Sequence, residues 1–318
     1  MNHRDNEEFI DLGEILRIIL IYKWYIVLGL IISGLASVFI ALSSPDIYRS
    51  SALLEPQENN QTQNAFSSMP PGMGGLASLA GVQLPSSSGD KALYAIEVIK
   101  SKVFLKHLLS IDSERILPSL VALESYDLNT NVSKFDKDLY DQDTNEWIRE
   151  VRPNQKKVPS YIEAHDYFLS ILEIFKDKKT GYVYIAIDHQ SPVFAQYLLS
   201  LIISEVNNIT KEMELKEAED AIEYLTAKQL TTNVSSVKLS INNIIESQLQ
   251  SQMLSNIREE FLLKTIDPPV VPEVKIAPSR LFICVIGSFF GFVLSIFSVL
   301  VFHLIRFNFF QVQDSPDT

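Results

Sequence analysis

The chain has 318 residues, of which 47% are hydrophobic, yet it carries a formal net charge of −12. A positive mean hydropathy of +0.11 beside so large a charge indicates membrane segments joined to a soluble part, and it excludes a largely disordered chain. The acidic excess, 39 Asp and Glu against 27 Lys and Arg, argues against nucleic-acid binding, because phosphate contacts need clustered cations. The single cysteine, Cys284, excludes a disulfide framework and a cysteine-based zinc site.

Residues 1–23 are predicted to form a cytoplasmic head. Asp11 with Glu14 three residues later favours a helix start, and Leu12, Ile15, Leu16 and Ile19 then fall on one face. We expect this amphipathic helix to lie along the membrane interface. The alternative is a plain extension of the membrane helix that follows.

Two uncharged, apolar segments are predicted to be transmembrane helices. The first is Trp24–Leu42, and the second is Leu281–Ile305, whose single ionisable side chain is His303. Each is long enough to cross a hydrocarbon core of about 30 Å. The first is interpreted as an uncleaved anchor rather than a signal peptide, because its apolar run is too long and acidic residues outnumber basic ones before it.

The region between the two helices, residues 43–280, is predicted to lie in the periplasm. Basic residues flank both helices on both sides, so the charge bias alone does not orient the chain. Long loops are translocated largely regardless of charge, which places both termini in the cytoplasm, with residues 306–318 as a short tail. The chain is therefore expected to be a two-pass protein of a bacterial inner membrane.

Small residues recur every four positions in both apolar segments. Such stripes allow close backbone approach, which holds helices together in lipid. The predicted packing residues are Gly29, Ser33 and Ser37 in the first helix and Gly287, Gly291 and Ser295 in the second. Chance is the competing explanation, because small residues are common in membrane helices.

The periplasmic part is predicted to contain a small mixed α/β base, residues 43–190 and 261–280. Strands are expected at Asp46–Glu55, at Tyr182–Asp188, which is apolar on both faces and therefore central, and at Phe261–Ile266. Helices are expected at Lys91–Leu109 and Tyr161–Lys176. Phe66–Gly89 is expected to be a partly ordered loop with one short helix; it has no GxxxxGK[ST] motif, which argues against nucleotide binding.

Residues 192–260 are predicted to form a long helical region. Ser191 supplies an N-cap and Pro192 a first-turn proline, and no Gly or Pro follows from Val193 to Asp267. One interruption is expected at Thr231–Ser236, where polar and β-branched residues cluster. The apolar stripe is too long for a small core, which favours packing against neighbouring chains.

Acidic residues gather before the predicted second helix of the base, at Asp136, Asp138, Asp141, Asp143 and Glu146. Paired carboxylates could hydrolyse a glycosidic bond, and alternating acids could bind calcium. The spacing lacks the EF-hand glycine and terminal glutamate, so we interpret the run as a solvated acidic loop. No catalytic, cofactor-binding or metal-binding residue is predicted.

Six segments, in this order around two membrane helices, resemble the Wzz-type chain-length determinants, or polysaccharide co-polymerases, without a kinase domain. They are IDLGEILRIILIYKWYI at Ile10–Ile26, DIYRSSALLEP after the first helix, GGLASLAG at Gly74–Gly81, KTGYVYIAIDHQSPVFAQ at Lys179–Gln196, EAEDAIEYL at Glu217–Leu225, and KTIDPPVVPEVKIAPSR before the second helix.

The resemblance implies a membrane α+β protein with two transmembrane helices flanking a periplasmic domain, which has a mixed α/β base and a long extended helix. It implies a ring-like homo-oligomer that sets the length of a lipid-linked glycan, such as the O-antigen of lipopolysaccharide, together with a polymerase, and that catalyses nothing. Pro268, Pro269, Pro272 and Pro278 correspond to the family's proline-rich segment, although their spacing is looser here. Prolines keep a chain extended, so the segment can act as a stiff connection.

Three alternatives remain open at this stage. The first is a kinase-less co-polymerase for capsule or exopolysaccharide export. The second is a membrane-anchored sensor or adaptor ectodomain, which would be expected to carry a cytoplasmic output module. The third is a membrane-tethered glycan hydrolase that uses the carboxylates of Asp136–Glu146.

Overall fold

The computed structural model describes residues 12–57, 88–153, 155–257 and 260–313. The expectations for Asp11, for most of Phe66–Gly89 and for the GGLASLAG segment lie outside the described residues. The chain divides into two compact units, residues 1–46 with 276–318, and residues 47–275, and each is described by itself.

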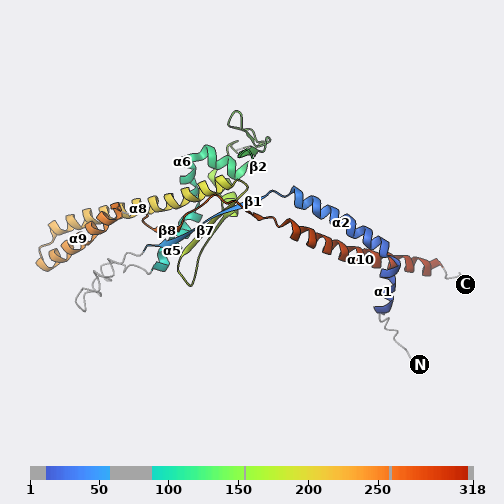
Figure 1. The fold of residues 1–318 in the computed structure, drawn as a ribbon. Coiled ribbons are helices and arrows are strands. Elements are labelled where there is room, and N and C mark those ends of the chain that lie inside the picture. Colours follow the sequence, from blue (N-terminus) through green and yellow to red (C-terminus); the bar gives the residue numbers. More distant parts are fainter. Residues whose placement is uncertain (1–11, 58–87, 154, 258–259, 314–318) are drawn as a thin grey trace, which may run out of the picture. The chain divides into compact units, whose positions relative to one another are not determined.

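The first unit is built from three helices: α1 (Leu12–Ile21), α2 (Lys23–Ser43) and α10 (Arg280–Gln313). The helix is interrupted between α1 and α2 at Tyr22, whose φ and ψ are −96° and 18°. The two apolar helices, α2 and α10, pack against each other (Figure 1).

The second unit contains an antiparallel sheet with the strand order β6-β7-β1-β8. The strands are β1 (Ile47–Pro56), β6 (Leu172–Lys176), β7 (Val183–His189) and β8 (Leu263–Asp267), while the short β9 (Lys275–Ala277) straddles the boundary between the units. The predicted strands at 46–55, 182–188 and 261–266 are thus confirmed to within two residues. The central position of β7 is confirmed as well, because it pairs with both β1 and β6.

Two helix predictions were wrong in their extent. The segment 161–176 is α7 (Tyr161–Ile171) followed by β6, because the chain turns at residues 177–181 and pairs Lys176 with Val183. The segment 91–109 lies in two helices, α5 (Ser88–Lys100) and α6 (Lys102–Val121). They separate at Ser101, whose Oγ accepts a hydrogen bond from the Phe104 amide and caps α6.

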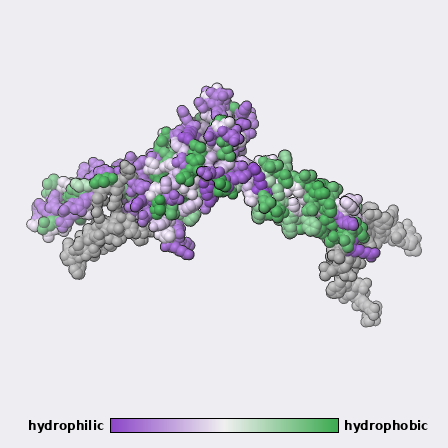
Figure 2. Space-filling model, in the orientation of Figure 1, coloured by the Kyte–Doolittle hydropathy of each residue, from purple (hydrophilic) through white to green (hydrophobic). Residues whose placement is uncertain are grey.

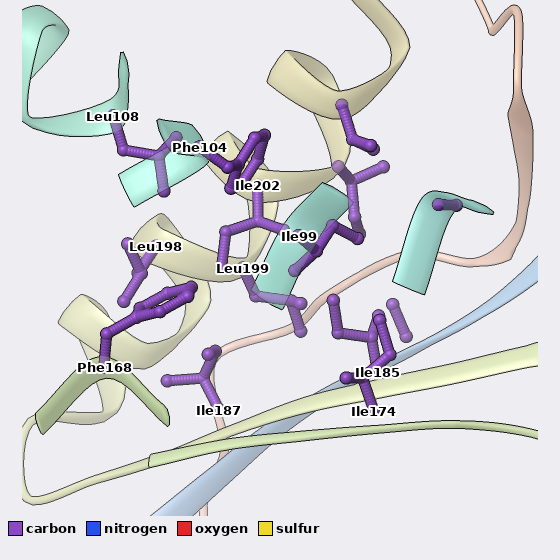
Figure 3. Close-up of a cluster of buried hydrophobic side chains, with 14 of the residues drawn as sticks. Ile99, Phe104, Leu108, Phe168, Ile174, Ile185, Ile187, Leu198, Leu199 and Ile202 are labelled. Atoms are coloured by element: carbon purple, nitrogen blue, oxygen red, sulfur yellow. The ribbon is translucent and has the colours of Figure 1, made fainter. Parts of the chain in front are cut away.

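The core of the second unit lies between the sheet and the helices that cover it. In Figure 3, Ile185 and Ile187 of β7 and Ile174 of β6 lie toward side chains of the long helix α8. The labelled residues at the centre, Ile99, Phe104, Leu108, Phe168, Leu198, Leu199 and Ile202, are at most 2% exposed. Arg49 of β1 forms a double hydrogen bond with Asp188 of β7, at 2.6 and 2.7 Å, and joins the two strands at the sheet surface.

The long helical region is a hairpin of two helices. α8 (Pro192–Thr231) begins at the predicted Ser191 cap, whose Oγ accepts from the Phe194 amide, and α9 (Ser235–Ile257) returns beside it (Figure 1). The predicted interruption at 231–236 is confirmed, because the chain leaves the helix at residues 232–234 and reverses direction. Between the two helices, Lys211 donates a hydrogen bond to the Asn256 carbonyl, and Gln229 donates one to the Asn242 side chain.

Residues 123–147, for which the sequence predicted no strand, form two small β-hairpins. The first pairs β2 (Leu123–Asp127) with β3 (Val132–Phe135), and the second pairs β4 (Tyr140–Asp141) with β5 (Glu146–Trp147). After them, α7 begins with a capping box in which Ser160 and Glu163 bond to each other's backbone amides. Arg149 bonds to Glu163 and lowers the pKa of its carboxyl.

Candidate functional site

The structure brings the six predicted packing residues together in one seam between α2 and α10. Gly29 faces Ser295, Ser33 faces Gly291, and Ser37 faces Gly287. Residue numbers rise along one helix as they fall along the other, so the helices are antiparallel. Each glycine thus lies opposite a serine.

No side chain larger than hydrogen fits at the three glycines of the seam. A Cβ on Gly29 would lie 2.6 Å from Ser295 Oγ, and one on Gly287 or Gly291 would overlap the opposing serine. Two of the serine hydroxyls find acceptors within their own helix, Ser33 at the Leu30 carbonyl (3.0 Å) and Ser37 at the Gly34 carbonyl (2.8 Å), while Ser295 of α10 donates to the Ile26 carbonyl of α2 at 3.5 Å. The helices therefore approach closely without leaving hydroxyls unpaired.

The outer faces of α2 and α10 are apolar and exposed. Trp24 is 75% exposed, Phe39 73% and Leu281 79%, and Figure 2 shows an almost continuous hydrophobic surface over the helix pair. In the apolar windows of the two helices only 17% and 6% of residues are buried, whereas the core helix of a soluble protein is mostly buried. Two helices, near the two ends of the chain, thus have the length and surface of transmembrane helices.

Polar and aromatic side chains mark the two ends of the helix pair. Arg280 donates to Asp46 at 2.9 Å where α10 begins and α2 has just ended. At the opposite end, the Tyr22 ring lies 6.4 Å from Phe302 and 6.1 Å from His303. Tyrosine is enriched at the two levels where a bilayer meets water, which fits this position.

The proline-rich segment divides between the two units, with Pro278 in the first and Pro268, Pro269 and Pro272 in the second. Pro268 and Pro269 line a groove of about 550 Å³ beside α8. Just beyond it, the Val270 carbonyl accepts a hydrogen bond from Ser50 of β1 at 2.8 Å. The segment is thus held against the second unit at its start.

One residue that the sequence did not single out, Asn207, fixes the return of the chain from α9 to the sheet. It is 4% exposed in the middle of α8. Its Oδ1 accepts from the amides of Leu262 and Leu263, and its Nδ2 donates to the carbonyls of Ile203 and Leu263. An asparagine on the buried stripe of a helix is the signal that could have revealed it.

Several apolar residues of α8 and α9 remain exposed on the single chain. They include Tyr224, Leu230, Leu239, Met253 and Ile257, each at least 63% exposed. On α8 the apolar side chains are buried near the sheet, at Phe194, Leu198 and Ile202, whereas Met213, farther along the helix, is 45% exposed. The outer part of the helical hairpin thus has apolar surface that the described part of the chain does not cover.

Two aspartates of the acidic run at 136–146 accept backbone hydrogen bonds that stabilise turns. Asp136 Oδ1 accepts from the Asp138 amide at 2.9 Å, and Asp141 Oδ1 accepts from the Asp143 amide at 3.0 Å. This second bond lowers the pKa of Asp141, because it favours the ionised carboxylate. Within the described residues, no group of three or more His, Cys, Asp or Glu could hold a metal ion.

Among solved structures, a full-length bacterial polysaccharide co-polymerase matches at 12% identity and a TM-score of 0.39, covering 94% of this chain and 98% of its own. A fragment of WzzB, a polysaccharide co-polymerase from Salmonella Typhimurium, matches at 12% identity and a TM-score of 0.32, covering 73% and 100%. The comparison with curated proteins found no match.

A family model matches the part of the chain that contains α2, β1 and α5. It is that of Wzz, the chain length determinant protein, and the matched residues are 8–110. The match includes three of the six segments on which the sequence resemblance was based, Ile10–Ile26, Asp46–Pro56 and Gly74–Gly81. The resemblance of this chain to the Wzz-type chain-length determinants is therefore confirmed.

Proposed function

We propose that this protein is a non-enzymatic, oligomeric scaffold of the bacterial inner membrane that regulates the chain length of a surface polysaccharide. The match of residues 8–110 to the chain length determinant family carries this proposal. The polysaccharide proposed is the O-antigen of lipopolysaccharide, and the proposed partners are its polymerase and the lipid-linked glycan.

The apolar surfaces support assembly in a membrane. The outer faces of α2 and α10 suit a hydrocarbon environment, and both termini are proposed to be cytoplasmic with residues 43–280 in the periplasm. In such an arrangement, copies of the chain stand side by side with their helical hairpins parallel. Neighbouring chains then cover residues such as Leu230 and Ile257, which are 80% and 79% exposed on one chain.

The proposed mechanism is geometric. The seam at Gly29, Gly287 and Gly291 holds α2 and α10 together, their apolar outer faces hold each subunit in the membrane, and the prolines 268–278 connect the periplasmic part to this anchor. An assembly of fixed size then keeps polymerase and growing glycan in an arrangement that biases when elongation ends. No step of this mechanism needs a catalytic residue.

Deletion of the gene tests the proposal. Surface polysaccharide is extracted from the deletion strain and from a strain complemented with the intact gene, and its bands are compared on a gel. We expect the length distribution to change on deletion and to return on complementation, with unchanged sugar composition. Unaltered banding of lipopolysaccharide would contradict the O-antigen role, and a change confined to capsular polysaccharide would move the function to capsule export.

A further inference from the structure

Three hairpin turns of the second unit share the sequence pattern Asp-x-x-Thr-Asn or Asp-x-x-Thr-Gly, at residues 127–131, 141–145 and 177–181. In each, the aspartate accepts a hydrogen bond from the amide two residues later, at 2.9, 3.0 and 2.7 Å. In each, the last residue has a positive φ: 54° at Asn131, 55° at Asn145 and 79° at Gly181. The three turns are therefore conformational copies.

Two of the copies carry an additional pair of side chains. Tyr126 precedes the first turn and donates its hydroxyl to Asn131 Oδ1 at 3.0 Å, and Tyr140 does the same to Asn145 Oδ1 at 3.0 Å. The third turn ends in Gly181, so the turn itself does not need a carboxamide. The tyrosine and asparagine pairs thus add something that the turn geometry does not require.

The two tyrosine and asparagine pairs line the same cleft. It has a volume of about 650 Å³ and lies between the two hairpins, α6 and the start of α8, within the second unit. The third turn does not line it. Because each tyrosine hydroxyl occupies an amide oxygen, each Nδ2 is left as a donor, and neither has a partner within the described part of the chain.

The rest of the lining combines charged groups with aromatic rings. From α6 come Glu114 and Arg115, and the Arg115 guanidinium is held 3.8 Å from the centre of the Tyr197 ring. Phe135 and Tyr140 form an edge-to-face pair, with ring centres 5.4 Å apart. Amide and guanidinium donors, a carboxylate acceptor and aromatic rings thus converge in one open cleft.

We propose that this cleft binds a saccharide segment, with pyranose rings against the aromatic side chains and hydroxyl groups bonded to Asn131, Asn145, Arg115 and Glu114. Carboxamides, guanidinium groups and carboxylates can each engage two neighbouring hydroxyl groups, and the C–H face of a pyranose packs on an aromatic ring. A peptide bound as an amphipathic helix would need an apolar groove. The lining is instead dominated by polar and aromatic side chains.

This inference deepens the proposed function and depends on it for the choice of ligand. If glycan elongation is regulated here, the ligand is the glycan itself, and the cleft gives each subunit a place to hold it.

The test measures binding of the cell's own polysaccharide to the full-length protein. Oligosaccharides released by mild acid from the surface polysaccharide of the source bacterium are titrated into protein in nanodiscs, because sugar-based detergents would compete. Saturation-transfer NMR and calorimetry report binding. The key variant is the double substitution Asn131→Gly and Asn145→Gly, because glycine adopts the positive φ of both positions and removes only the amides.

We expect the wild type to bind and the double variant to bind about tenfold more weakly, since two hydrogen bonds are lost. Asn129→Ala removes an exposed amide of the same turn that does not line the cleft, and should change affinity less than about twofold. Tyr126→Phe keeps the ring and releases Asn131, so it should give an intermediate loss. Unchanged melting temperatures would confirm that the variants are folded.

Two outcomes would overturn the inference. One is an absence of binding to the wild type, and the other is equal binding by wild type and double variant. If the double variant alters polysaccharide banding while its oligosaccharide binding is unchanged, the cleft serves a protein partner and the saccharide inference is wrong. The deletion experiment is read separately, so normal length regulation without oligosaccharide binding would leave the proposed function standing.

Discussion

The two units of this protein bury opposite kinds of side chain. In the second unit the interior is formed by large residues such as Phe104 and Phe168, which are 2% and 0% exposed. In the first unit, glycine and serine meet at three levels between α2 and α10, while the large side chains of Trp24 and Phe39 are 75% and 73% exposed. Large apolar side chains thus lie in the interior of the second unit and on the outer surface of the first.

The difference follows from the solvent that surrounds each unit. Water drives large apolar side chains together, so the second unit gains stability from area removed from water. Lipid tails are as apolar as leucine, so helices in a bilayer gain little by burying leucine and more by close backbone contact. If the first unit lies in a membrane, equivalent substitutions should have different effects in the two units.

The largest difference in stability is expected between two leucine-to-alanine substitutions, one in each unit. Leu198→Ala removes a side chain that is 0% exposed in the core of the second unit and should lower the free energy of unfolding by about 3 kcal/mol. Leu35→Ala removes one that is 67% exposed on α2 and should change stability by less than about 0.5 kcal/mol. Urea unfolding of the protein in nanodiscs, followed by tryptophan fluorescence, measures both. Equal losses would mean that the outer face of α2 is a packed protein surface.

A second substitution tests a polar contact of the second unit. Asn207→Ala leaves the amides of Leu262 and Leu263 without their acceptor in a buried position, and should cost about 2–3 kcal/mol. The neighbouring Asn208→Ala removes an exposed side chain that bonds to Glu205, and should cost less than about 0.5 kcal/mol. Hydrogen exchange at Leu262 and Leu263 should accelerate only in the first variant. Unchanged exchange there would show that Asn207 does not fix the return of the chain.

Local patterns in the sequence predicted several elements of the fold, but they did not reveal the long-range contacts of Asn207. Strands β1 and β7 were predicted because alternation and apolar faces are local patterns, and α8 because Ser191 and Pro192 define its start. Asn207 bonds to residues 55 and 56 positions later, a pairing that no local pattern specifies. Strand β6 was mistaken for helix because its five residues follow α7 directly and take their conformation from pairing with β7.

The hairpins of the proposed saccharide cleft are a different case, because their signal was local and was overlooked. The repeated Asp-x-x-Thr pattern with Asn or Gly after it occurs at 127–131, 141–145 and 177–181 and has a direct structural meaning. What the sequence could not supply is the meeting of two of these turns with Arg115 in one cleft, since that depends on tertiary packing.

A third pair of substitutions tests the seam of the first unit. Gly291→Ala places a methyl group against Ser33 and should weaken the α2–α10 contact by about 1–3 kcal/mol. Gly34→Ala puts one at an ordinary 3.7 Å from Ser288 and should not weaken the contact, since alanine is a better helix former than glycine. Disulfide formation between cysteines introduced at Ile26 and Ser295, whose carbonyl and hydroxyl are 3.5 Å apart, should slow in the first variant only. The experiment needs Cys284→Ser as background, and equal rates would argue against close packing at Gly291.

The smallest effect is expected from pH, and it should be confined to the second unit. His189 is 7% exposed, with Nε2 donating to the Ser119 carbonyl and Nδ1 accepting from the Ser191 amide, both at 3.0 Å. Burial lowers its pKa below the ordinary value of 6.5, and a proton on Nδ1 would remove the acceptor for Ser191.

In the unfolded chain His189 takes up a proton as the pH falls through 6.5, whereas the folded chain does so only at lower pH. Its contribution to stability is therefore complete above 6.5 and declines below that value. Urea midpoints of the second unit, measured at pH 7.5, 6.5 and 5.5, should be level between the first two and fall at the third. His189→Gln cannot be protonated and should show a shallower fall, while an identical fall in both proteins would assign the pH dependence to other groups.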